Sequence, residues 1–183
     1  MHEALVERAA AGDREAFAGL VRGVADRLFA VAWRVLRDAD AAEDAVQAAL
    51  IAAWDDLPTL RDPARFEAWV YRLTVRSACR EARRSRPRVA TVRLLDPDGG
   101  EDPDPAAFAA DRDAVAHGFA GLSAEHRAVL VLRFYVGLTV PEIAETLAIP
   151  VGTATSRLHY GLRAMRATLE AEARMDLAQE ATP

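Results

Sequence analysis

Residues Trp69–Val89 read WVYRLTVRSACREARRSRPRV and combine an apolar pattern with seven arginines. With about 3.6 residues per helical turn, one stripe carries Arg72, Arg76, Arg80 and then Arg83 or Arg84. The opposite stripe is largely apolar and consists of Val70, Leu73, Val75, Ala78, Cys79 and Ala82. The pattern predicts a helix that packs on a core by one face and exposes guanidinium groups on the other.

The exposed face of this helix has two possible meanings. Within the stretch only Glu81 opposes the arginines, and the aromatic residues Phe66, Trp69 and Tyr71 lie at or just before its start. Basic side chains beside aromatic rings suit single-stranded nucleic acid, which offers phosphates to neutralise and bases to stack. From this stretch alone, a solvated charged surface and a nucleic-acid face both remain open.

The composition of the whole chain favours an all-α fold. The 183 residues are 51% hydrophobic and rich in alanine, leucine, arginine and glutamate, with few β-branched runs. A single cysteine excludes a disulfide framework and a thiolate metal cluster. No apolar run approaches the ~20 residues of a membrane span, and the N-terminus lacks a signal-peptide pattern. We therefore expect a cytoplasmic protein.

A break in the helical pattern divides the chain into two modules. Residues 88–117 hold three arginines against seven acidic residues, a net charge of −4, and nothing between Pro97 and Pro105 is apolar. The Asp-Pro and Gly-Gly pairs in this segment stop helices. The pattern predicts an acidic flexible linker over 88–117, between helical modules at 1–87 and 118–172, with a tail at 173–183.

Two further helices are expected before the arginine-rich one. The stretch DREAFAGLVRGVADRLFAVAWRVLRD has a helical apolar period, and DADAAEDAVQAALIAAWDDL follows with Asp40 as a candidate N-cap. The expected inner face of the second consists of Ala45, Val46, Ala49, Leu50, Ala53 and Trp54. Helices with such short connections form a bundle.

The C-terminal module has the pattern of a helix-turn-helix. One helix is expected from a Ser123 cap to Gly137, and a second from a capping box of Thr139 and Glu142, with Pro141 in its first turn. The break AIPVG precedes a longer helix, Gly152–Leu169. Its expected inner face is Ala154, Leu158, Leu162, Met165 and Leu169. An ordinary helical hairpin is the alternative to a DNA-binding helix-turn-helix.

Taken in order, these motifs resemble a known family. AGDREAFAGLV, AAEDAVQAALIAAW, RFEAWVYRLTVRSACREARR and LSAEHRAVLVLRFYVGLTVPEIAETLAIPVGTATSRLHYGLRAM are similar to extracytoplasmic-function (ECF) sigma factors of the sigma-70 family. The resemblance covers almost the whole chain except the linker and the last dozen residues. It implies two helical domains, regions 2 and 4 of a sigma factor, that recruit core RNA polymerase to promoters.

The resemblance also assigns residues. It places Glu43, Asp44 and Gln47 in contact with the clamp coiled coil of the largest catalytic polymerase subunit. It places the base-flipping and melting of the −10 element on the segment that carries Arg65, Phe66, Trp69, Arg72, Arg76, Arg80, Arg83 and Arg84. It places the −35 element against a helix whose outward residues are Thr153, Thr155, Ser156, Arg157, His159, Tyr160 and Arg163. The implied partners are core polymerase, promoter DNA and an anti-sigma factor, without a cofactor or metal.

Two other classes of protein fit the sequence less well. A stand-alone regulator with a helix-turn-helix would leave the EDAVQ helix and the arginine stripe without a role. An enzyme is not expected, because His2, His117, His126 and His159 lie scattered without metal-ligand spacing and no nucleophile sits beside a base.

Overall fold

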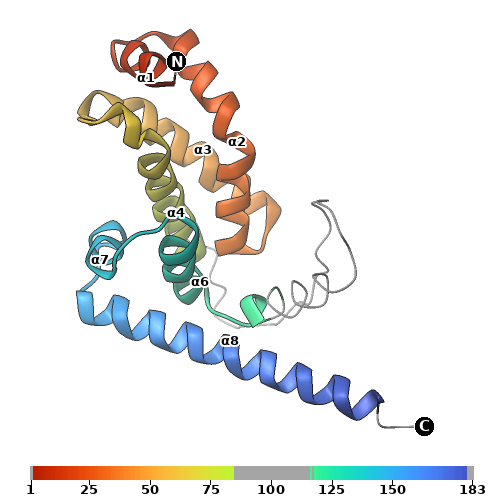
Figure 1. The fold of residues 1–183 in the computed structure, drawn as a ribbon. Coiled ribbons are helices and arrows are strands. Elements are labelled where there is room, and N and C mark those ends of the chain that lie inside the picture. The colour runs from red at the N-terminus through yellow and green to blue at the C-terminus, as the bar shows by residue number, and fades with distance from the viewer. Residues whose placement is uncertain (1, 85–115, 117, 181–183) are drawn as a thin grey trace.

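The computed structural model describes residues 2–84, 116 and 118–180, and the regular structure of these residues is helical (Figure 1). The all-α prediction is confirmed for them. The elements are α1 (His2–Ala10), α2 (Arg14–Leu36), α3 (Ala39–Asp56), η1 (Leu57–Thr59), η2 (Pro63–Arg65), α4 (Phe66–Arg84), α6 (Ala124–Leu130), η3 (Val131–Tyr135), α7 (Val140–Leu147) and α8 (Val151–Glu180). The predicted linker lies almost entirely outside the described residues.

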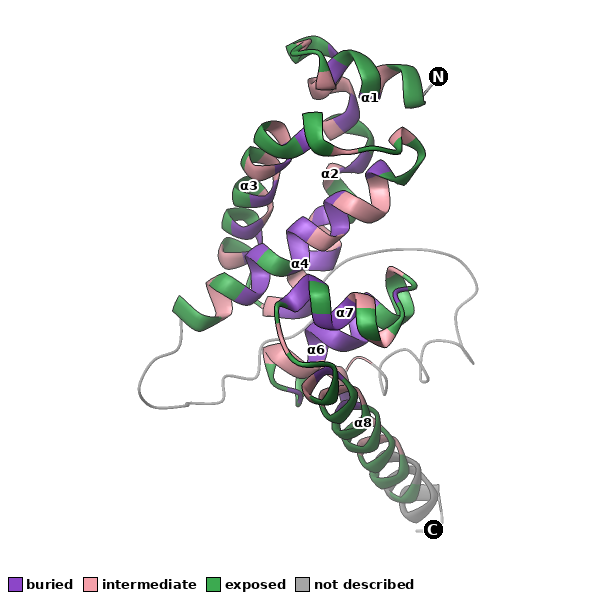
Figure 2. Ribbon diagram, turned by 90° about the vertical axis from the view of Figure 1, so that its left-hand side faces the viewer, coloured by how far each residue is buried: buried purple, intermediate pink, exposed green. Residues whose placement is uncertain are grey.

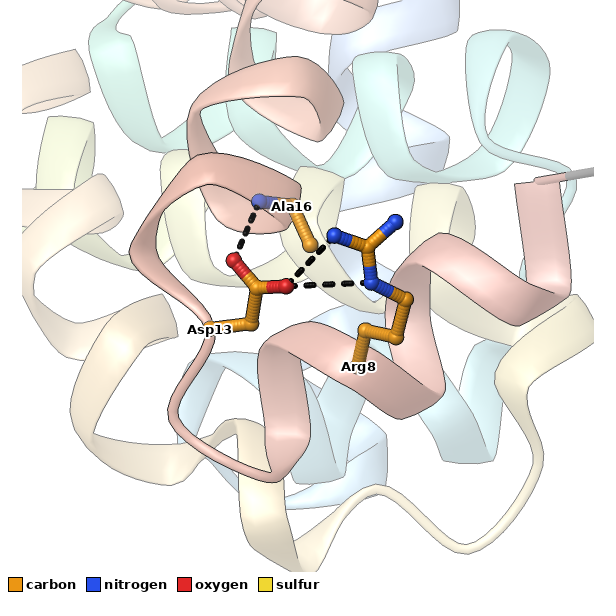
Figure 3. Close-up of polar contacts among 3 residues, drawn as sticks. All are labelled: Arg8, Asp13 and Ala16. Atoms are coloured by element: carbon orange, nitrogen blue, oxygen red, sulfur yellow. Dashed lines mark hydrogen bonds and ion pairs between the residues drawn. The ribbon is translucent and has the colours of Figure 1, made fainter.

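Aspartate side chains set the starts of α2 and α3. Asp13 accepts the Ala16 backbone N–H at 3.0 Å and also pairs with Arg8, whose guanidinium lies 2.6 Å away (Figure 3). The cap of α3 is Asp38, which accepts the Ala41 N–H at 2.9 Å. The prediction of Asp40 as that cap was wrong, because α2 ends in a left-handed residue and the chain enters α3 with Asp38 extended.

The N-terminal module is built on α2, α3 and α4, which pack against one another, with α1 against α2. The apolar stripe of the arginine-rich helix is its inner face, since Val70, Val75 and Ala78 are fully buried. The largest fully buried side chains of this module include Leu20, Leu28, Leu57 and Phe66. The periodicity of the sequence therefore identified the core-facing side of α4 correctly.

The C-terminal module begins as predicted. Ser123 caps α6, and Thr139 and Glu142 form the capping box of α7, with the Thr139 N–H donating to Glu142 at 2.8 Å. The helix that starts with α6 does not stay regular up to Gly137, because it widens into the π-helical segment η3 before it ends. Gly137 then turns the chain with a φ of +82°.

The long helix α8 differs from the expectation in two ways. It continues to Glu180, beyond the predicted end at Leu169. Leu162 is 43% exposed and does not belong to the inner face. Gly161 takes that place and is so close to α6 that a Cβ there would lie 3.3 Å from Leu130 Cδ1. The bare backbone of Gly161 lets the two helices approach.

Candidate interaction surfaces

A groove of about 860 Å³ runs between α2 and α3. Apolar side chains line it, and Phe17 packs edge-on against Trp54 with their rings 5.1 Å apart. Ile51, also in the groove, is 60% exposed. Glu43, Asp44 and Gln47 are exposed and belong to the same lining. The groove therefore places polar side chains of α3 beside an apolar surface.

This groove explains a difference from the expected inner face of α3. Ala45, Ala49 and Ala53 are buried, as predicted. Val46, Leu50 and Trp54 are only half-buried, because they line the groove instead of filling the core. The aromatic side chains that α2 adds, Phe17 and Phe29, were not predicted as part of a site. The sequence did carry one signal for this groove, because the apolar residue Ile51 interrupts the polar face of α3.

The outer face of α4 carries the predicted arginines. Arg76, Arg80, Arg83 and Arg84 are exposed, and Arg72 is half-buried. Arg84 pairs with Glu81 at 3.7 Å, and Arg65, just before the helix, pairs with Asp62 at 3.4 Å. Arg80 donates to the Ser77 hydroxyl at 3.2 Å. The structure thus gathers the basic side chains on one face of α4.

The aromatic residues near this face have different environments. Phe66 is 1% exposed, so its ring belongs to the core and is not available to a nucleic acid. The expectation for Phe66 fails because the first residue of α4 turns inward against the bundle. Trp69 is half-buried, with its ring 6.1 Å from that of Phe66. Of the two predicted aromatic contacts, only Trp69 keeps part of its surface free.

The predicted recognition face of α8 is mostly open. Thr155, Ser156, His159, Tyr160 and Arg163 are exposed, and Thr153 and Arg157 are half-buried. Two hydroxyls bond to the helix itself, from Thr155 to the Val151 carbonyl and from Ser156 to the Thr153 carbonyl, both at 3.0 Å. Arg163 and the Tyr160 ring, 58% exposed, are the prominent side chains of the middle of this face.

Comparison with known proteins accounts for both modules. Residues 20–88 match the family described as Sigma-70 region 2, and residues 118–167 match Sigma-70, region 4. The chain belongs to the ECF sigma factors of the sigma-70 family. Proteins of this family bind core RNA polymerase and direct it to promoters, and the sequence resemblance is confirmed.

Relatives and solved structures agree with this family. The ECF RNA polymerase sigma factor SigL of Mycobacterium tuberculosis is 40% identical, over 87% of this chain and 94% of SigL. SigW of Bacillus subtilis is 29% identical, over 86% of this chain and 91% of SigW. The structure of CnrH in complex with the cytosolic domain of CnrY matches with a TM-score of 0.59 and 27% identity, over 93% of this chain and 97% of that one.

A second solved structure shares the fold. It is the sigma factor RpoE of Bartonella quintana in complex with the anti-sigma factor NepR, with a TM-score of 0.54 and 22% identity, over 84% of this chain and 96% of that one. Among the described residues of this ECF sigma factor, no helix is long and apolar enough to cross a membrane.

Proposed function

We propose that this ECF sigma factor uses three surfaces, one for each step of promoter recognition. The α2–α3 groove binds core RNA polymerase, the arginine face of α4 binds the opened −10 element, and the exposed face of α8 reads the −35 element. Residues 1–87 and 118–172 form the two functional domains, with 88–117 as the linker and 173–183 as the tail. The protein acts in the cytoplasm, without cofactor or metal, and has no catalytic role of its own.

The observation that carries the polymerase assignment is the exposed groove. Surfaces that bind other proteins combine an apolar centre, rich in aromatic residues, with a polar rim. Here Phe17 and Trp54 supply the apolar centre, and Glu43, Asp44 and Gln47 supply the rim. Most of the groove lining, from Ala25 to Trp54, also lies within residues 20–88, which match region 2. An α-helical coiled coil is a suitable occupant, because its side chains can fill such a groove between two helices.

The α4 assignment rests on charge and local aromatic surface. Arg76, Arg80 and Arg83 are exposed on one side of the helix, and Trp69 lies near its start. Guanidinium groups can bind phosphates, and a partly exposed indole can stack on an unpaired base. We keep Arg65, Trp69 and the arginines of α4 in the proposed −10 surface and leave out Phe66. The α8 assignment rests on its place as the second helix of a helix-turn-helix with an open polar face.

Two kinds of partner follow besides DNA. Core RNA polymerase is the first, and an anti-sigma factor that covers one or more of these surfaces is the second. The solved relatives with partner chains support the second, since CnrH is seen with the cytosolic domain of CnrY.

The polymerase assignment is tested by reversing the charge of the groove rim. Asp44 and Gln47 are exposed, so replacing both with arginine should leave the module folded and abolish binding to core polymerase. Asp55→Arg, an exposed position of α3 that does not line the groove, is the matched control. Binding is measured by co-migration with core polymerase on size-exclusion chromatography, and folding by circular dichroism. Normal holoenzyme formation by the folded double variant would remove the assignment.

A further inference from the structure

The two modules are packed directly against each other. Helix α6 contacts both α2 and α4, and it lies beside α4 in both views (Figures 1 and 2). The segment η3 also contacts α2. Buried residues of both modules, such as Val35 and Val75 on one side and Val129 and Leu132 on the other, form one continuous apolar core. The arrangement is therefore held by burial as well as by the polar contacts described next.

Arg127 of α6 is the main polar contact of this junction. Its side chain is buried, with Nε donating to the Val35 carbonyl of α2 at 2.7 Å and Nη1 to the Leu122 carbonyl at 2.6 Å. Val35 lies in the last turn of α2, where carbonyls have no partner within the helix and a positive charge is favoured. Burial lowers the pKa of the Arg127 guanidinium to about 10, and the nearby charge of Arg37 acts in the same direction. It remains charged at neutral pH.

A second contact joins aromatic rings across the junction. Tyr71 of α4 and Tyr135 of η3 meet edge to face with ring centroids 5.8 Å apart. The guanidinium of Arg34 lies over the Tyr135 ring, 5.4 Å from its centroid. Tyr135 is the last residue of the π-helical segment η3. Its neighbour Phe134 is 66% exposed and takes part in neither of these two contacts.

In this arrangement α7 lies along the arginine face of α4. Thr146, Leu147 and Ala148, at its C-terminal end, face Arg76, Arg80 and Arg83 across a cleft of about 410 Å³. At its N-terminal end, hydrogen bonds from Thr139 lower the pKa of Glu142, with smaller effects from the charges of Arg72 and Arg65. The two ends of α7 thus lie near the two ends of the arginine stripe.

We infer that the junction is an autoinhibitory contact: while Arg127 and Tyr135 hold the modules together, α7 borders the α4 face that would bind the opened −10 strand and narrows the approach to it. The inference rests on the proposed role of α4. The arginines of this face stay exposed, but a strand bound along Arg76, Arg80 and Arg83 would have to enter the cleft of about 410 Å³ that Thr146–Ala148 line on the other side. Strand binding therefore competes with the closed arrangement, and opening should strengthen it.

The chain carries its own reporter of closure in Cys79, its single cysteine. Cys79 lines the same cleft and is buried. Burial raises the pKa of its thiol to about 11, while charges of both modules, Arg83 and Arg157 among them, act on it. Separation of the modules should expose the thiol and return its pKa toward the ordinary value. Because alkylation requires access and thiolate, its rate should rise about tenfold or more on opening.

The test compares variants of the full chain. Tyr135→Ala removes the ring contact, and Phe134→Ala is its matched control at the neighbouring position. Arg127→Met removes the buried guanidinium, with Arg166→Met, at an exposed position of α8, as its control. Iodoacetamide labelling of Cys79 at fixed pH gives the alkylation rate, circular dichroism verifies folding, and fluorescence anisotropy with an oligo-thymidine strand gives the single-strand affinity. We expect Tyr135→Ala and Arg127→Met to raise both rate and affinity several-fold, and both controls to match the wild type.

Three other results have distinct meanings. Alkylation rates equal to wild type in both folded junction variants would overturn the inference, whatever the affinity. Faster alkylation without tighter strand binding would also overturn it if Arg80→Glu in the Tyr135→Ala background weakens binding, since α4 then binds DNA and closure does not inhibit it. Faster alkylation with binding that Arg80→Glu leaves unchanged would instead remove the proposed DNA role of α4, while the closed arrangement itself would stand.

Discussion

Asp13 and Asp38 show how single side chains fix the start of a helix. Each carboxylate accepts the backbone N–H three residues ahead, at 3.0 Å and 2.9 Å respectively. The first N–H groups of a helix have no partner inside it, so such an acceptor stabilises the first turn. The sequence pattern predicts Asp40 as the cap of α3, whereas the structure shows Asp38 in that role. The end of α2 explains the difference, because Arg37 adopts a left-handed conformation and Asp38 follows it extended.

This assignment gives a stability prediction. Asp38→Ala should reduce the free energy of unfolding by about 1 kcal/mol, the usual effect of losing an N-cap. Asp40→Ala, in the first turn of the same helix, should cost less, because it removes only a favourable charge near the helix N-terminus. Urea unfolding followed by circular dichroism measures both. Equal losses, or a larger loss for Asp40→Ala, would contradict the cap that the structure shows.

Asp13 makes stability depend on pH. Its hydrogen bond from the Ala16 N–H, followed by the bond from Arg8, lowers the pKa of its carboxyl below 3.8. A lowered pKa in the folded state means that the stabilisation is complete well above pH 3.8 and is lost as the pH falls through the folded pKa. We expect the melting temperature of Asp13→Asn, which keeps an acceptor but has no charge, to fall less steeply in this acidic range. Parallel curves for the two proteins would disprove the contribution of the charge.

At the scale of elements, helices with a strong apolar period were predictable and close contacts were not. The buried stripe of α4 and the caps of α6 and α7 follow from local residue patterns. The exposure of Leu162 does not, because it depends on how near Leu130 of another helix comes to Gly161. The α2–α3 groove and the π-helical segment η3 could not be predicted from the sequence for the same reason. Each depends on packing between elements, which a single segment does not encode.

The role proposed for α8 predicts a salt effect in the holoenzyme. Arg163 is exposed on the predicted recognition face, and if it binds a phosphate, Arg163→Ala should weaken all promoters alike and lower the salt slope of binding by about one. Arg174→Ala, an exposed change about three turns further along α8, should leave the slope unchanged. Filter binding over a range of salt concentrations measures the slope. An unaltered slope and affinity for Arg163→Ala would show that this side chain does not contact the backbone of the DNA.

For the whole molecule, we expect charge and module packing both to oppose DNA binding by the free protein. The net charge is −5, and sequence-independent affinity comes mainly from neutralised phosphates. Helix α7 also borders the cleft beside the arginines of α4. The −10 contacts proposed for α4 would in addition require an unpaired strand. Polymerase can hold both modules on one promoter, so that two weak contacts act at a high effective concentration.

We therefore expect little binding to duplex promoter DNA by the protein alone. A gel-shift experiment on one promoter fragment should show a sequence-selective complex only when core polymerase and this protein are mixed, and not with either component alone. Tight and selective duplex binding by the isolated protein would favour a stand-alone regulator with a helix-turn-helix instead.

The partner of Arg127 across the junction has a consequence for exchange of domains between related factors. Arg127 binds the carbonyl oxygen of Val35, a backbone group that every amino acid supplies at that position. In a chimera that combines this C-terminal module with another N-terminal module, the same bond can form wherever the second helix ends at the same turn. The fit of a foreign module then depends on the side chains that replace Arg34 and Tyr71 around the ring of Tyr135. Exchange of domains between related factors can therefore keep the bond from Arg127 to the backbone carbonyl, while the side-chain contacts around Tyr135 change.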